Sequence, residues 1–442
     1  MPVILLLLSI VLIIVLTTRL HVHAFLALFI VAMLYAFAAG MPLNQVVASI
    51  NEGFGSTLGK IGLIIIFGVI IGAFLENTGA AFKLAQKILN IVGANRVTAA
   101  MAYMGYFISI PVFADSGFLL ISSLCKTLAK KANLSITGPA IALALGLMAS
   151  HVMVPPTPGP VAAAGILEAD LGLVLLIGIP LSAIALIPGI LFASRVAARV
   201  YIDPAPDITT QELEEKIRRA PGALKGSLPI VVPILLIILK SLTDYIALQN
   251  KVLVHAISFV GEPVIALFIG VLLSLTLPDR LQKDMLSSTG WVGQALKDAA
   301  AILLITGAGG IFGKVLQNSG IADWLGDILS DANFGIWLPF ILAATIKTAQ
   351  GSSTVAIITT ASIVAPLMGT LGFDGDIQRV LVVIAIGAGS AVVSHVNDSF
   401  FWVVTQLSGI PVRTGYYIYT LGTLVLGMSA AILVYVLSLI IA

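Results

Sequence analysis

Long apolar segments, separated by short polar breaks, follow one another along almost the whole chain. Many approach the roughly 20 residues that cross a bilayer as a helix, and the period-two alternation of barrel strands is absent. Because lipid offers no partners to backbone groups, such segments are expected to be helices. In the first half the apolar segments are 3–18, 23–39, 60–76, 97–113, 116–131, 136–154, 158–168 and 171–200. In the second half they are 228–247, 253–277, 296–316, 335–349, 353–371, 378–396, 399–407 and 414–441.

Several of these segments are too short to span a bilayer alone, so broken helices and re-entrant hairpins are expected, facing protein or a watery cavity. Composition agrees with a polytopic all-α membrane protein: apolar residues make up 59% of the 442 residues and charged residues only 10%. Soluble domains carry about 25% charged residues. The net charge of +2, without a basic run, gives no sign of nucleic-acid binding, and the single Cys125 excludes an internal disulfide.

A polar segment, 201–226, divides the chain into near-equal membrane parts, 1–200 and 227–442. Acidic residues come first in it and basic residues last, which suits a short surface helix whose charges complement the helix dipole. With Arg195 and Arg199 just before it, the segment is rich in Lys and Arg and is predicted to be a soluble, cytoplasmic loop.

The two halves resemble each other. The segment Ile71–Gly79 aligns with Phe312–Gly320, and each ends in Asn-(Thr/Ser)-Gly, a common helix stop. An amphipathic piece follows in each half, at Phe82–Leu89 and at Trp324–Leu329, and polar breaks centred on a histidine come later in both. Features in the same order at similar spacing predict two repeats of inverted topology, an arrangement in which transporters bind substrate between discontinuous helices.

The first two breaks lie in the N-terminal half. Break one, 111–117, places Asp115 and Ser116 within apolar sequence; Asp115 is either a helix N-cap, a proton carrier or an acceptor for substrate hydroxyls. Break two runs from Ser150 through His151 to Pro160, and its dense Pro and Gly cannot form a regular helix. Backbone amides at Thr157 and Gly159 are candidates for binding an anion, and His151 for titrating at physiological pH.

The other two breaks lie in the C-terminal half. Break three, 350–354, is rich in small hydroxyl residues that cap a helix and suit a carboxylate; Lys347 before it either lines a cavity or snorkels to the interface. Break four, 394–399, is the densest polar cluster, with His395, Asn397 and Asp398 as candidates for binding hydroxyls and a proton. A surface loop is the alternative interpretation of break four.

The sequences around these breaks closely resemble the gluconate permease (GntP) family of bacterial inner-membrane transporters. The resemblance rests on Pro155–Pro160 after a histidine, on Gly351–Ala356 and on Ser394–Asp398, with support from Met41–Leu43 and Asn318–Gly320, and it covers essentially the whole chain. It implies proton-driven uptake of a small sugar acid or hydroxy acid. It also implies kinship with the wider ion-transporter superfamily, which has an inverted repeat and paired re-entrant hairpins.

The chain departs from the family pattern at two positions. Members that transport gluconate typically have a Tyr-Glu-Val-Gly-like sequence where this chain has Ala114–Gly117, and often have His where Thr157 stands. Glycerate, another aldonate and D-serine therefore remain alternatives to gluconate, and sodium remains an alternative to the proton.

These arguments predict a proton-coupled symporter in the bacterial inner membrane, with a small carboxylate, protons and the lipid bilayer as partners and with neither cofactor nor metal. A homo-oligomeric state is left open. The substrate-binding candidates are Asp115, Ser116, His151, Thr157, Gly159, Gly351, Ser352, Ser353, Thr354, His395, Asn397 and Asp398. The proton-coupling candidates are Asp115, His151, His395 and Asp398.

Two other classes of function are less favoured. A channel would use the same repeat but would conduct only downhill. An intramembrane hydrolase would need Ser116 or Ser352 beside His151 or His395, and the chain has no Gly-x-Ser-x-Gly nucleophile elbow. It also lacks the Gly-x-x-x-x-Gly-Lys-(Ser/Thr) motif, which argues against an ATP-driven pump.

Overall fold

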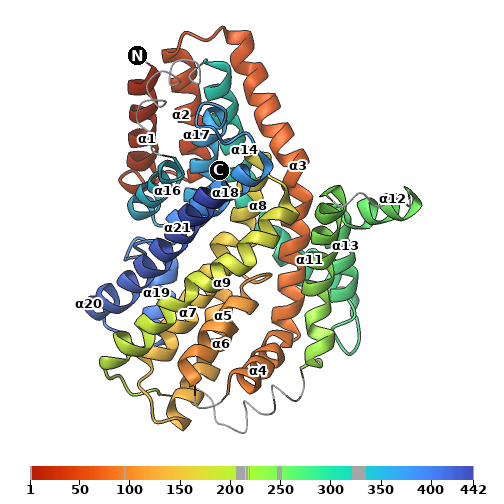
Figure 1. Cartoon of the computed structure of the whole chain (residues 1–442), viewed down its shortest axis with the longest axis vertical. Coiled ribbons are helices and arrows are strands. Elements are labelled where there is room, and N and C mark those ends of the chain that lie inside the picture. The colour runs from red at the N-terminus through yellow and green to blue at the C-terminus, as the bar shows by residue number, and fades with distance from the viewer. Residues whose placement is uncertain are drawn as a thin grey trace.

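Helices form all the regular secondary structure in the part of the chain that the structure describes (Figure 1). This computed structural model describes residues 2–93, 96–205, 215, 218, 220–245, 251–320 and 335–441. In the first half the helices are α1 (Pro2–Thr18), α2 (Ala24–Ala38), α3 (Leu43–Asn77), α4 (Ala80–Val92), α5 (Val97–Ile108), α6 (Ala114–Lys131), α7 (Thr137–Met153), α8 (Pro158–Ile166) and α9 (Leu171–Arg195). In the second half they are α11 (Ala223–Tyr245), α12 (Lys251–Val260), α13 (Pro263–Ser274), α14 (Trp291–Asn318), α16 (Trp337–Gln350), α17 (Ser353–Val364), α18 (Asp376–Ala391), α19 (Ser399–Leu407), α20 (Val412–Gly415) and α21 (Leu421–Ile441).

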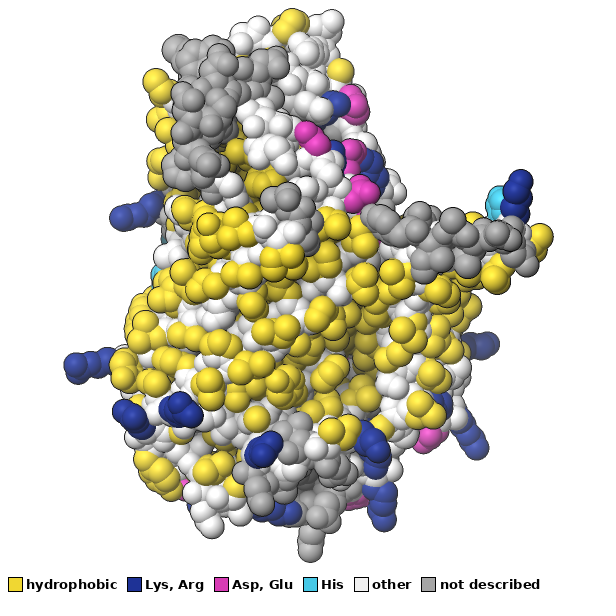
Figure 2. Space-filling model, in the orientation of Figure 1, with side chains coloured by type: hydrophobic (Ala, Val, Ile, Leu, Met, Phe, Trp, Pro, Cys, Tyr) yellow, Lys and Arg dark blue, Asp and Glu magenta, His cyan; other side chains and the backbone are white. Residues whose placement is uncertain are grey.

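The prediction of a polytopic all-α membrane protein is confirmed. Among the described residues, 6 helices are long and apolar enough to cross a membrane, or 7 if α12 and α13, bent by 64° at their junction, are counted as one broken span. Figure 2 shows a broad apolar belt across the middle of the visible face, with most Lys and Arg beyond its edges. Lipid-facing apolar side chains and charged margins are what a bilayer requires.

A long antiparallel pair, α3 and α14, crosses the fold, and α3 runs along much of its length (Figure 1). The amide Nδ2 of Asn318, at the end of α14, donates to Ser49 Oγ near the start of α3 at 2.9 Å. The two backbones nearly touch farther along, where a Cβ on Gly53 would lie 2.6 Å from the Gly310 carbonyl oxygen. Glycine at this crossing is therefore required by the packing.

The aligned helix ends of the two halves have the same local geometry. Gly79 and Gly320 follow α3 and α14 with φ of 71° and 73°, and the preceding Thr78 and Ser319 each donate a side-chain hydrogen bond to the last helical turn at 2.7 Å. The predicted amphipathic counterpart of α4, Trp324–Leu329, lies outside the described residues. So does most of the surface helix predicted within 201–226.

Short helices meet at the four predicted breaks. The helices α5 and α17 have 12 residues each, about 18 Å at 1.5 Å per residue, which is too short for a hydrocarbon core of about 30 Å. Residues 109–113 join α5 to α6 and residues 351–352 join α16 to α17, whereas 154–157 interrupt α7 and α8, and 392–398 interrupt α18 and α19. The helix α8 packs on α17, and α6 packs on α19, so the breaks of the two halves come together.

Candidate binding site between the helix breaks

All four breaks contribute to a cavity of about 280 Å³, break two only through His151 on α7. Eight of the twelve predicted binding residues line it: Asp115, His151, Gly351, Ser352, Ser353, Thr354, Asn397 and Asp398. The other lining residues are not among the candidates predicted from the sequence: Phe113, Ala114, Met148, Gln350, Ser399 and Phe400. The wall is thus built from both halves of the chain, with polar groups concentrated at helix ends.

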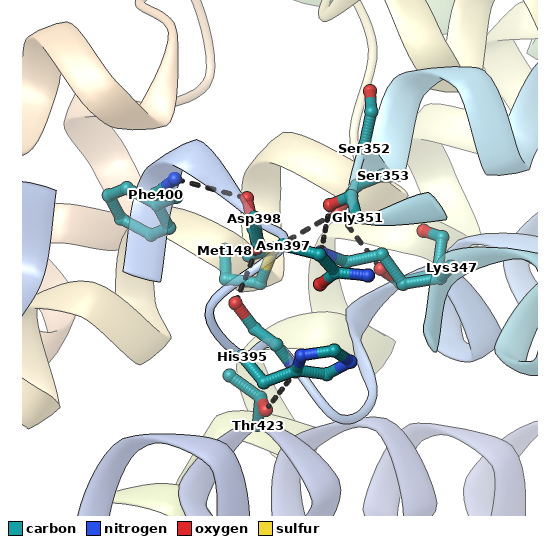
Figure 3. A network of polar contacts seen from close by, with 12 residues as sticks. Met148, Lys347, Gly351, Ser352, Ser353, His395, Asn397, Asp398, Phe400 and Thr423 are labelled. Atoms are coloured by element: carbon teal, nitrogen blue, oxygen red, sulfur yellow. Dashed lines mark hydrogen bonds and ion pairs between the residues drawn. The ribbon is translucent and has the colours of Figure 1, made fainter. Parts of the chain in front are cut away.

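Asp398 is held by donors on both carboxylate oxygens (Figure 3). Its Oδ1 accepts the backbone N–H of Phe400 at 3.0 Å, so Asp398 caps the N-terminus of α19. Its Oδ2 lies 2.6 Å from the Nζ of Lys347 and also accepts the hydroxyl of Ser394. Because 0% of the Lys347 side chain and 7% of the Asp398 side chain are exposed, this is a buried ion pair.

Lys347 also joins break three to break four. Its ammonium donates to the carbonyl oxygen of Gly351 in addition to Asp398. From the sequence, this lysine either lines a cavity or snorkels to the membrane–water interface. In the structure its side chain is buried directly behind the cavity wall. A charged residue in apolar sequence was the available signal for this role.

A strained bend shapes break four. Val393 has φ of 50°, which is unusual for a β-branched residue. The bend is held from α21 and from the π-helix η5 (Tyr416–Thr420): Thr423 Oγ1 accepts the N–H of Ser394 at 3.1 Å, and Thr420 Oγ1 donates to its carbonyl at 2.6 Å. Backbone strain of this kind persists only where the surroundings impose it. The sequence carried no signal for these two threonines, because threonines are common in apolar helices.

His395 and Asn397 both reach back to the C-terminus of α16. The His395 Nε2 donates to the carbonyl of Thr348 at 2.9 Å, and the Asn397 Nδ2 donates to the carbonyls of Thr348 and Ala349 at 2.9 and 3.0 Å. These bonds satisfy carbonyls that a helix end leaves without partners. Asn397 still lines the cavity, whereas His395 lies outside it, with its ring 6.3 Å from that of Tyr416.

The start of α17 presents open donors to the cavity. Ser352 caps this helix by accepting the N–H of Val355 at 3.3 Å, while the N–H groups of Ser353 and Thr354 belong to the first turn, which has no intrahelical acceptors. The Ser353 hydroxyl donates to the carbonyl of Ser390 at 2.9 Å, whereas that of Thr354 forms no hydrogen bond with a described residue. A negatively charged group is favoured at such a helix end.

Two buried polar atoms in the cavity wall have no partner among the described residues. They are Oδ1 of Asp115, near the start of α6, and Nδ1 of His151, near the end of α7. An unsatisfied buried polar atom costs about 1–3 kcal/mol, so both atoms are placed to receive a ligand group. The ring of Phe113 covers His151 at a centroid distance of 6.1 Å.

Four predicted residues lie outside the cavity lining: Ser116, Thr157, Gly159 and His395. The Thr157 hydroxyl donates to the carbonyl of Val154 at 2.5 Å, and a Cβ on Gly159 would lie 2.8 Å from Ile357 Cδ1, which gives Gly159 a packing role between α8 and α17. Pro158 and Pro160 have no N–H. The first turn of α8 therefore offers fewer amides to an anion than that of α17.

Comparisons with known proteins show which family the chain belongs to. A sequence profile of the GntP family permeases matches residues 1–440. The chain belongs to this family. It is 34% identical to the inner membrane permease YgbN of Escherichia coli over 435 residues, covering 95% of each chain. It is 33% identical to a gluconate permease of Pseudomonas aeruginosa over 434 residues, covering 97% of this chain and 95% of that one.

This GntP-family permease also shares its fold with a solved transporter. The crystal structure of the Alcanivorax borkumensis YdaH transporter matches 89% of each chain with a TM-score of 0.59 and 15% identity. The family match and the apolar spans together establish a multi-pass protein of the bacterial inner membrane. Its relatives are permeases and transporters, so the cavity belongs to a transport protein and not to an enzyme.

Proposed function

We propose that this permease is a proton-coupled symporter that imports a small sugar acid such as gluconate. The observation that carries the proposal is the cavity, whose lining includes both the unpartnered Oδ1 of Asp115 and the open first turn of α17. A polyhydroxylated carboxylate has one group for each: a hydroxyl donates to Asp115, and the carboxylate accepts from α17. The names of the gluconate permeases related to this chain support the choice of substrate.

The carboxylate is assigned to Ser353 and Thr354. The donors there are two backbone amides and the Thr354 hydroxyl, and the positive end of the α17 dipole favours an anion. The substrate hydroxyls are assigned to Asp115, His151 and the Oδ1 of Asn397, since the Asn397 amide nitrogen is already engaged with α16.

Coupling to protons follows from the cost of moving an anion through an apolar fold. Burial of an isolated carboxylate is strongly unfavourable, and a proton that enters with it makes the load neutral. The lining contains three groups that can carry a proton, namely Asp115, His151 and Asp398. His395, also a candidate from the sequence, is engaged with α16 outside the cavity and is assigned a positioning role.

We further propose that residues 1–200 and 227–442 are inverted repeats joined by the cytoplasmic segment 201–226. Helices of the two halves pack on each other in matching pairs, which supports this division. The helix α2 packs on α14, and α13 packs on α3. Likewise, α8 packs on α17, and α6 packs on α19. A Cβ on Gly62 would contact Leu303 at 3.7 Å. Positions 62 and 303 are equivalent when the alignment of Ile71–Gly79 with Phe312–Gly320 is extended toward the N-terminus. Equivalent residues of two inverted repeats meet where the two-fold axis between the repeats passes.

Proteoliposomes that contain the purified protein provide the test. Labelled gluconate should accumulate above its external concentration under an inward proton gradient, and a protonophore should abolish the accumulation. Unlabelled gluconate, glycerate and D-serine, tested as competitors, would rank the substrate classes. Accumulation that survives the protonophore but requires a sodium gradient would replace the proton by sodium, and uptake that only equilibrates would indicate a channel.

A further inference from the structure

We propose that Lys347 and Asp398 form the charge switch that binds the proton and the substrate anion together. When Asp398 takes up a proton, the ammonium of Lys347 loses its counter-charge, and the carboxylate of the substrate in the adjoining cavity replaces it. This inference rests on the proposed symport and assigns its coupling to one pair of residues.

The geometry places the cation one contact away from the ligand. Lys347 lies in the last turn of α16, and its ammonium hydrogen-bonds to two described groups that line the cavity, the Asp398 carboxylate and the Gly351 carbonyl (Figure 3). The described lining contains no Lys or Arg, so Lys347 is the positive charge in direct contact with it. Gly351 belongs to break three, which also contains the open first turn of α17, and Asp398 belongs to break four.

The burial of the pair makes the two binding events depend on each other. Both charges have left water, and removal of one partner from such a pair leaves a buried charge that is strongly unfavourable. A proton on Asp398 alone creates that unfavourable state, and an anion beside the intact pair adds a second negative charge near Asp398. Proton and anion together restore the balance, so each raises the affinity for the other, as linkage requires.

Two other titratable groups among the described residues line the cavity, and neither forms a hydrogen bond with the cation. Asp115 approaches from α6 and His151 from α7, each with an unpartnered atom, whereas the buried Tyr419 on η5 lies outside the lining. His395 is bonded to the Thr348 carbonyl. Protonation of Asp398 therefore removes the negative charge that neutralises Lys347, whereas Asp115 is placed to accept a substrate hydroxyl.

The first test separates coupling from binding in proteoliposomes, with labelled gluconate as the probe. Accumulation is measured under an inward proton gradient, and counterflow is measured at equal pH with unlabelled gluconate inside. Asn at 398 keeps the shape and the helix cap but leaves Lys347 permanently without a counter-charge. D398N should therefore continue counterflow, lose accumulation to the level of protonophore-treated wild type, and show a KM that no longer changes with pH.

The lysine gives the complementary result. K347M should raise the KM for gluconate by at least tenfold in counterflow, and K347R, which keeps a cation, should recover most of that loss. K130Q is the matched control, because Lys130 forms an exposed ion pair with Asp203 away from the cavity; it should match wild type in both assays. Accumulation by D398N at the wild-type level, or by the double variant K347M/D398N, would overturn the inference.

A second measurement uses the wild-type protein and does not depend on whether a variant folds. Addition of gluconate to the purified protein in weakly buffered detergent should cause proton uptake, which a pH indicator records. K347M that still binds gluconate with the same proton uptake would also overturn the assignment. Loss of coupling in D115N but not in D398N would move the proton to Asp115 and leave symport intact, whereas a wild type that never accumulates gluconate would contradict the proposed symport of gluconate itself.

Discussion

The backbones of Gly351 and Asn397 are in contact: a Cβ atom at position 351 would lie 2.1 Å from the carbonyl oxygen of Asn397. Gly351 also has φ of 93°, a conformation that other residues adopt only under strain. The connection between α16 and α17 thus meets the connection between α18 and α19 without an intervening side chain. Residue 351 determines how closely these two cavity-lining segments approach each other.

The substitution G351A should reduce the transport rate at least tenfold, because the methyl group separates these two segments and adds backbone strain of about 1–3 kcal/mol. Uptake by proteoliposomes with equal amounts of protein gives the measurement. G372A is the matched control, since Gly372 has φ of 73° with no atom within 4 Å of its Cβ position. Equal effects of the two substitutions would show that strain alone, and not the contact with Asn397, causes the loss.

Replacement of Asp115 tests its role as a hydroxyl acceptor. D115N removes the charged acceptor but keeps the shape, and a hydrogen bond to a charged group contributes about 1.5–3 kcal/mol. The KM for gluconate in counterflow is expected to rise by roughly 10- to 150-fold. S116A, whose hydroxyl lies outside the cavity lining, is the control. A KM for D115N within twofold of wild type would remove Asp115 from the substrate contacts.

The hydroxyl of Thr354 is expected to contact the substrate. T354V keeps the branched shape and removes only the hydroxyl, so the KM should rise by about 2- to 12-fold, the equivalent of a net hydrogen bond of about 0.5–1.5 kcal/mol. The melting temperature should change little, because this hydroxyl has no partner in the described protein. S353A provides the contrast: it breaks the bond to the Ser390 carbonyl and should lower the melting temperature more than T354V does.

The exposed ion pair between Lys60 of α3 and Glu168, which lies between two spans, predicts a small pH-dependent contribution to stability. Lys60 donates to Glu168 at 2.6 Å, which lowers the pKa of the Glu168 carboxyl below the ordinary glutamate value of 4.5. The pair therefore stabilises the fold above this value and the contribution disappears as the pH falls below it. Both side chains are more than half exposed, so E168Q should cost less than about 1 kcal/mol at pH 7.

Thermal unfolding in detergent at pH 7 and near pH 3 measures this contribution. Wild type and E168Q should differ at pH 7 and converge at the lower pH. K60Q should cost a similar amount, and the double variant little more than either single one, because the two residues interact with each other. A difference that persists at low pH would point to packing of Glu168 and not to its charge.

The sequence predicted the fold class and most of the cavity lining, because polar residues within apolar segments are expensive and therefore conspicuous. Asp115, His151 and Asp398 were all found in this way. Their partners were harder to predict: that Lys347 turns toward Asp398 depends on how α16 packs beside α18. Gly159 shows the opposite limit, because glycine beside prolines indicates a break but does not distinguish ligand contact from close packing.

The support for break four was not visible in the sequence at all. Thr420 of η5 and Thr423 of α21 hold Ser394 from more than twenty residues later in the chain, and the strained Val393 directly precedes Ser394. Long-range hydrogen bonds of this kind leave no local pattern. The inverted relation of the halves and the placement of 201–226 in the cytoplasm remain predictions.

Because helices of each half pack on helices of the other half, a single half cannot form the complete fold on its own. In the other half of the chain, α8 packs on α17 and α6 packs on α19, and both of these partners lie beyond residue 350. A fragment that stops near residue 200 would expose these apolar faces to lipid and would leave Asp115 and His151 on a surface with no opposite wall. The candidate binding site therefore forms only when both halves have been synthesised and have closed on each other.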